Sequence, residues 1–374
     1  MSGLYGRSAL IALIALRLVI GAIAIQVLTE EPVRDGDVLR FHEVGNSPGI
    51  PYVDHEVEYA PLELLAIHLI AGETPATTGT RLVLAALAAD LAAAAGIAWG
   101  WGRRAATAFL LLGAPLLVFL YLRFDPLTVA LAVWAAALCR RRREVAGGMA
   151  FGASVLAKLW PAAILPALLM EGRRRAAVAG VVTAIVGATL WLGLTTPSAP
   201  LQVLTFRGAT GWGVESPIGT AVWLATGGPT RLERGAPRIG AVPQWTTPVL
   251  GLALASTAAG IWLTARRREV DAFGTPALGA LGALLTFSPL FSLQYASWLV
   301  PWAVIAHADG DRRALPLTAT VTAATGLLFA LYDAGLLTTA RFVLVLRAVA
   351  VAGLVVSAFF PGSSRRGGDG VTAR

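Results

Sequence analysis

The feature that most constrains the fold of this chain is a succession of long apolar segments separated by short clusters of arginine. The first segment, residues 8–28, contains one charged residue, Arg17, and similar runs continue almost to the C-terminus. A helix needs about 20 apolar residues to cross the hydrocarbon core of a bilayer. The pattern therefore predicts an all-α, polytopic transmembrane bundle.

Composition agrees with this interpretation and limits the possible partners. The 374 residues are 56% hydrophobic and 14% charged, whereas soluble domains carry roughly 25% charged residues. A net charge of +8 is compatible with nucleic-acid binding, but the arginines flank apolar segments and are not interleaved with aromatic residues. We therefore expect a lipid bilayer as partner and no nucleic acid. The single cysteine, Cys139, excludes a disulfide framework.

The arginine clusters set the expected topology, because short cytoplasmic loops are enriched in Lys and Arg. Alternation from these clusters gives about twelve spans, with both termini cytoplasmic. We expect residues 1–360 to form one transmembrane domain with outer loops at 29–60 and 195–245, followed by a disordered cytoplasmic tail at 361–374. Residues 61–71 are too few to span and predict an interfacial or re-entrant helix. A further hairpin should break at Lys158–Pro161, since proline ends helices.

The polar residues of this topology gather on the outer side, most densely in the first outer loop. Carboxylates beside aromatic residues suit a sugar-hydroxyl site with a carboxylate base, although a simple solvated loop is the alternative. The histidines there, His42 and His55, lack metal-ligand spacing, so no metal or cofactor is expected. The candidate residues of this loop are Asp35, Asp37, Arg40, Tyr52, Glu58 and Tyr59.

Four further places carry candidate residues. Lys158 is the only lysine, and an ammonium within the membrane costs about 2.5–3.5 kcal/mol; it suits a lipid-linked phosphate, or else it snorkels to water. Arg123 and Asp125 end a span and are either site residues or an interfacial ion pair. Asp90, in mid-span, should be buried against a polar partner. The remaining candidates are Arg207 in the second outer loop, which loop decoration explains better, and Gln294 and Tyr295, which also suit an interfacial belt.

The order of these motifs resembles a known family. The segments are Glu58-Tyr59-Ala60-Pro61, Arg123-Phe124-Asp125, Lys158-Leu159-Trp160-Pro161 with Pro166, and Phe291-Ser292-Leu293-Gln294-Tyr295 through Pro301. Together they resemble the polyprenol-phosphate-mannose-dependent mannosyltransferases of glycosyltransferase family 87, which have the GT-C membrane fold. Ala60 stands where the family often has a proline, and the family's histidine near the later outer turn is not evident.

The resemblance implies a function. Such an enzyme transfers a sugar, commonly mannose, with inversion from a polyprenyl-phosphate donor to a glycolipid or glycan acceptor outside the plasma membrane. The family's essential aspartate lies in the first outer loop and matches Asp37, with Asp35 as the alternative. Lys158, with Arg123 or Arg207, would stabilise the donor phosphate, and the other candidates would bind substrate. A secondary transporter or lipid-linked-sugar flippase is the competing hypothesis, and a non-catalytic membrane subunit is a third.

Overall fold

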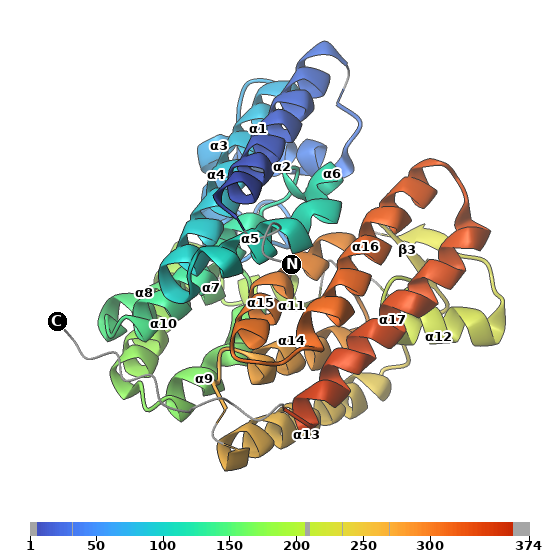
Figure 1. The fold of residues 1–374 in the computed structure, drawn as a ribbon. Coiled ribbons are helices and arrows are strands. Elements are labelled where there is room, and N and C mark those ends of the chain that lie inside the picture. Colours follow the sequence, from blue (N-terminus) through green and yellow to red (C-terminus); the bar gives the residue numbers. More distant parts are fainter. Residues whose placement is uncertain (1–5, 32, 206–209, 234, 269, 362–374) are drawn as a thin grey trace.

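The computed structural model describes residues 6–31, 33–205, 210–233, 235–268 and 270–361, and these residues are mostly helical (Figure 1). The expected tail therefore lies outside the described residues, apart from Pro361. The helices of the first half are α1 (Arg7–Glu30), α2 (Gly36–Asn46), α3 (Pro61–Ile70), α4 (Pro75–Trp101), α5 (Arg103–Gly113), η2 (Ala114–Leu116), α6 (Leu117–Leu120), α7 (Asp125–Arg140), α8 (Glu144–Ala157), η3 (Trp160–Ile164), α9 (Leu165–Met170) and α10 (Arg174–Leu194).

The second half has two short helices in the second outer region and a group of longer ones. These helices are α11 (Ala199–Thr205), α12 (Pro217–Thr226), α13 (Thr246–Arg268), α14 (Thr275–Phe287), η5 (Leu293–Trp298), α15 (Val300–Ala308), α16 (Ala314–Asp333) and α17 (Leu337–Phe359). Figure 1 shows α17 lying along α13 and α16, with α12 and β3 beside the end at which α17 begins.

Seven helices of the described chain are long and apolar enough to cross a membrane: α1, α4, the run Arg103–Leu120, α10, α13, α16 and the run Thr339–Phe359. They support a membrane protein. The other apolar helices are shorter, so the count of twelve spans and the side of the termini stay predictions. Helix α3 has 10 residues and is about 15 Å long, which is too short to cross an apolar core of about 30 Å.

The expected helix break is confirmed. Helix α8 ends at Ala157, and Lys158 leaves the helical conformation with ψ 148°. Pro161 then lies in the first turn of η3, where its fixed φ is compatible with a helix and its missing N–H costs nothing. The break leaves the lysine side chain at a helix end, free to point toward neighbouring elements.

The two outer regions contain more regular structure than expected. Residues 29–60 include α2, and residues 195–245 include a small three-stranded antiparallel sheet in a chain that is otherwise helical, as the all-α prediction requires. The strands β1 (Trp212–Gly213), β2 (Arg231–Glu233) and β3 (Ala236–Ile239) are ordered β1-β3-β2. Gly235 has a φ of 77°, a conformation that glycine adopts without strain, and so permits the tight β2–β3 connection.

Several arginine-bearing loops meet at one end of the bundle, which we call the arginine end. Arg140 pairs with Asp271 at 3.2 Å, and Arg173 pairs with Glu144 at 3.5 Å. Arg313 donates a hydrogen bond to the backbone carbonyl of Phe360 at the end of α17. Loops far apart in sequence therefore share one end, as the positive-inside pattern requires.

A buried ion pair joins the first helices. Arg17 Nε of α1 lies 2.7 Å from Asp90 Oδ2 of α4, and both side chains are almost completely buried. Tyr121 donates a second hydrogen bond to the same carboxylate at 3.1 Å. The expectation of a buried polar partner for Asp90 is confirmed. Removing either charge would leave the other uncompensated in an apolar interior, which is strongly destabilising.

We expect the arginine end to face the cytoplasm, and cysteine labelling tests this orientation. We expect Glu43→Cys to react with a membrane-impermeant maleimide in intact cells, and Ala308→Cys to react only after permeabilisation. Both positions are exposed, and Cys139→Ala provides the background because Cys139 is buried. Labelling of Ala308→Cys in intact cells would show that the arginine end is not cytoplasmic.

Candidate active site

Helix α2 brings the first two candidate carboxylates together. Asp35 is its N-cap, and its Oδ1 accepts hydrogen bonds from the backbone N–H groups of Asp37 and Val38, each at 3.0 Å. Such a cap satisfies donors that have no partner within the helix. The Asp35 carboxylate therefore holds the start of α2 and fixes the position of Asp37 on its first turn.

Arg123 connects this helix to the start of α7. Its Nη1 donates hydrogen bonds to both oxygens of Asp35, at 3.1 and 3.2 Å. Its Nε lies 2.8 Å from Asp37 Oδ2. The Asp37 side chain is 45% exposed, against 20% for Asp35. Of the two carboxylates, Asp37 is the one with its surface open to a substrate.

The surroundings of Asp37 alter its proton affinity. Protein atoms crowd the carboxylate on the sides that are not open, and this burial raises the pKa of Asp37 above its ordinary value. Arg123 opposes the rise and Asp35 adds to it, while Lys158 and Asp125 are close enough to act on the same pKa. A carboxylate with a raised pKa is a better proton acceptor than an ordinary aspartate.

A second group of charges fixes the C-terminal part of the first outer region. Arg40 donates hydrogen bonds to Glu58 at 3.1 and 3.3 Å and to Glu43 at 2.9 Å. Phe41, one residue on, packs against the rings of Tyr59 and Phe124 with centroid distances of 5.5 and 4.9 Å. Arg40 of α2 thus binds Glu58, and Tyr59 packs on Phe41 of the same helix.

Tyr52 is a buried packing residue of this region. It has a φ of 66°, its hydroxyl donates to the carbonyl of Tyr59, and its ring meets Trp191 of α10 edge-on at 5.3 Å. Gln202 of α11 donates to the Tyr52 carbonyl at 2.8 Å and accepts from the Val57 N–H at 3.2 Å. Gln202 of the second outer region therefore holds the first outer region by two hydrogen bonds, a contact that the sequence did not indicate.

Lys158 lies between two buried carboxylates. Its Nζ is 3.0 Å from Asp125 Oδ2 and 3.2 Å from Glu63 Oε1. Asp125 also accepts a hydrogen bond of 2.6 Å from the indole N–H of Trp298. Sequence reasoning missed Glu63 and Trp298. A carboxylate in the first turn of the apolar α3 was the available signal for Glu63.

Aromatic rings extend this cluster to η5. Trp298 stacks on Tyr295 with centroids 4.0 Å apart and on Trp160 at 5.3 Å. Gln294 is half-buried, and its backbone carbonyl accepts a hydrogen bond from Ser297 at 2.6 Å. The cluster therefore brings Tyr295 next to Asp125, as expected for residues of one site. Arg207 lies outside the described residues.

An apolar groove includes Arg123 in its lining. It has a volume of about 360 Å³ and is formed by α3, α4 and α7, with Leu62, Leu65, Ala86 and Leu127 in its wall. Arg123 is the charged residue of this lining. Because its wall is apolar, the groove suits a hydrocarbon chain, and the Arg123 side chain in its lining suits an anionic head.

Comparison with models of known protein families shows which family the chain belongs to. The family model of glycosyltransferase family 87 matches residues 58–292. The chain belongs to glycosyltransferase family 87. No curated protein matches it.

Membership of glycosyltransferase family 87 makes the protein a membrane glycosyltransferase. The match contains Glu58, Glu63, Arg123, Asp125 and Lys158. Helix α2 precedes the matched range and η5 follows it. Among the described residues, no three His, Cys, Asp or Glu side chains form a group that could hold a metal ion.

The Lys158 cluster generates a test based on charge balance. We expect Lys158→Met to lower the stability of the protein by about 3–5 kcal/mol, because two buried carboxylates lose their shared cation. Adding Glu63→Gln should recover much of this loss, since one negative charge is then removed. Thermal unfolding in detergent micelles measures both effects. If the double variant is no more stable than Lys158→Met alone, the pairing of Lys158 with Glu63 does not carry the stability.

Proposed function

We propose that this family 87 enzyme transfers a sugar, most simply mannose, from a polyprenyl-phosphate donor to a glycolipid or glycan acceptor on the outer face of the plasma membrane. Asp37 is the general base, and the transfer inverts the anomeric centre. The observation that carries the proposal is the position of Arg123, which contacts Asp37 and also lines the apolar groove.

Asp37 suits the role of base better than its neighbours. Asp35 uses its carboxylate to cap α2 and to bind Arg123. Glu58 is bound by Arg40, and Asp125 by Lys158 and Trp298. The Asp37 carboxylate pairs with Arg123 and remains 45% exposed, which leaves it able to reach an acceptor hydroxyl.

The donor fits the groove at Arg123. An isoprenoid chain is apolar and occupies apolar surface for the same reason that acyl chains do. A guanidinium forms charge-assisted hydrogen bonds with a phosphate. Because Nε and Nη1 of Arg123 contact Asp37 and Asp35, its Nη2 would donate to the phosphate. A donor whose chain lies between α3, α4 and α7 would therefore bring its phosphate to Arg123 and its sugar toward Asp37.

The proposed reaction is a single displacement. The acceptor hydroxyl gives its proton to the Asp37 carboxylate as its oxygen attacks the anomeric carbon. The bond between that carbon and the phosphate oxygen breaks, and polyprenyl phosphate leaves with the bonding electrons. Arg123 stabilises the negative charge that develops on the leaving group, so no general acid is required.

Lys158 was predicted to contact the donor phosphate, and that stays a prediction. In this structure its ammonium is bound by two carboxylates, so a direct role would require the phosphate to replace one of them. We propose that Lys158 chiefly positions Asp125 and, through Phe124, the neighbouring Arg123. Phe124 is buried against Phe41 of α2, which makes this connection stiff.

The base assignment predicts the effect of one substitution. Asp37→Asn should lower the rate of sugar transfer by at least about 100-fold, because the amide cannot accept the acceptor proton. The measurement is transfer of radiolabelled sugar from a polyprenyl-phosphate donor in membranes, with the amount of protein held equal.

Two matched variants separate this effect from a general change of charge in the loop. Glu56→Gln removes one charge from an exposed residue of the same region and should retain activity. Asp35→Asn should have an intermediate effect, because an amide oxygen can still cap α2. Full activity of Asp37→Asn would exclude Asp37 as the base, and a greater loss in Asp35→Asn would transfer the role to Asp35.

The raised pKa of Asp37 predicts a pH dependence. The base works when ionised, so kcat/KM should fall as the pH drops through the pKa of Asp37, at a higher pH than an ordinary aspartate would give. Arg123 lowers this pKa, so Arg123→Gln should move the acidic limb of the profile to higher pH. Arg81→Gln, an exposed arginine of α4, is the control. An unmoved limb in Arg123→Gln would contradict the pairing.

A further inference from the structure

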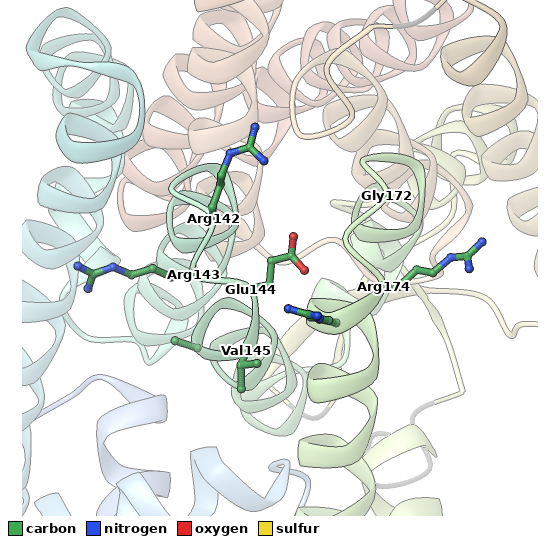
Figure 2. Close-up of a pocket in the computed structure, with 8 residues that line it drawn as sticks. Arg142, Arg143, Glu144, Val145, Gly172 and Arg174 are labelled. Atoms are coloured by element: carbon green, nitrogen blue, oxygen red, sulfur yellow. The ribbon is translucent and has the colours of Figure 1, made fainter. Parts of the chain in front are cut away.

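A hollow opens at the arginine end of the bundle, at the N-terminal end of α8, whereas Lys158 lies at the C-terminal end of that helix. It has a volume of about 710 Å³ and is open to the surface. Figure 2 shows Arg142 and Arg143 on one side of it, Arg174 on the other and Glu144 between them. Arg175 also contributes to the lining.

The positive charge around this hollow is only partly neutralised. Glu144 pairs with Arg173 at 3.5 Å. In the described part of the chain, no carboxylate pairs with Arg142, Arg174 or Arg175. Arg142 adopts a φ of 60°, an uncommon conformation for a residue with a side chain. The hollow therefore concentrates unpaired cations at the membrane surface.

Two helix N-termini add to this positive potential. Helices α8 and α10 both begin at the hollow, with Arg143 and Arg173 as their N-caps, and neither cap supplies a side-chain hydrogen bond. The first N–H groups of a helix carry partial positive charge and favour anions. Arginine at such a position is electrostatically unfavourable, and an anion in the hollow would relieve the repulsion.

The parallel course of the two helices is fixed by close packing. A Cβ atom on Gly148 would lie 2.2 Å from the carbonyl oxygen of Ala176, and one on Gly152 would lie 2.5 Å from that of Gly180. The pair Gly148 and Gly152 is the small-residue spacing that brings helices together in membranes. The two N-termini are therefore held side by side as a rigid feature.

Apolar surface continues from the hollow along both helices. Val145 lines the hollow, and Met149 follows it one turn along α8; both are exposed. On α10, Val178 follows Arg174 at the same spacing and is also exposed. Residues four apart lie on one face of a helix. A ligand in this hollow would meet cations at the surface and apolar side chains just beneath it.

We propose that this hollow binds the headgroup of an anionic membrane phospholipid, with its acyl chains along the apolar faces of α8 and α10. The argument rests on the unpaired arginines, the two uncapped helix starts and the adjoining apolar surface. It is independent of the proposed transfer reaction. The general attraction of juxtamembrane arginines to anionic lipid is diffuse, whereas the hollow predicts a defined site.

Native mass spectrometry of the detergent-solubilised protein tests this site. Dioleoylphosphatidylglycerol should bind with a defined stoichiometry, and dioleoylphosphatidylcholine should bind far less. The double variant Arg174→Gln/Arg175→Gln should weaken phosphatidylglycerol binding by about 30-fold, from about 1 kcal/mol for each arginine near the surface.

A matched control distinguishes a defined site from diffuse attraction. Arg266→Gln/Arg267→Gln removes the same charge from the exposed end of α13, which does not line the hollow, and should retain binding within about threefold. Equal losses in the two double variants would overturn the proposal. Displacement of the lipid by millimolar glycerol phosphate would also overturn it, because the site would then recognise a soluble anion. Unchanged thermal unfolding of both variants confirms that they are folded.

Discussion

The shared pairing of Lys158 with Asp125 and Glu63 is the interaction on which the rest of the site depends. Its three charges come from the end of α8, the start of α7 and the first turn of α3. A buried carboxylate in an apolar setting needs a cation beside it, and Glu63 and Asp125 share the Lys158 ammonium. The pairing therefore fixes three helix ends at once, and the indole of Trp298 adds η5 through its hydrogen bond to Asp125.

This cluster also fixes the position of Arg123. It lies two residues before Asp125, and the intervening Phe124 is buried against Phe41 of α2. The same turn of chain thus presents a carboxylate to Lys158 and a guanidinium to Asp37. Arg347 of α17 has a comparable role on the far side, since it donates to the carbonyls of Phe291 and Glu215 and so holds the segment before η5 against the second outer region.

The membrane class and the outline of the site could be predicted from the sequence, because apolar length and arginine placement are local properties. The break at Lys158 and the burial of Asp90 followed from them, whereas the contact of Asp37 with Arg123 did not. Partners could not be predicted: Glu63 was hidden in a short apolar helix, and the contact of Gln202 with Tyr52 joins residues 150 positions apart. The small sheet was missed because its strands of two to four residues leave no periodic pattern.

The charges around Arg123 indicate from which side the donor and the acceptor of the proposed reaction would bind. On the side of α2 and α3, carboxylates outnumber cations, a setting that suits the neutral hydroxyls of a sugar acceptor and repels phosphate. On the side of the groove, Arg123 is the charged group that the lining presents. A phosphate donor is therefore favoured from the groove and an acceptor from the side of Asp37. The acceptor hydroxyl and the leaving phosphate would then lie on opposite faces of the donor's anomeric carbon, and attack opposite the leaving group is the geometry that inverts the centre.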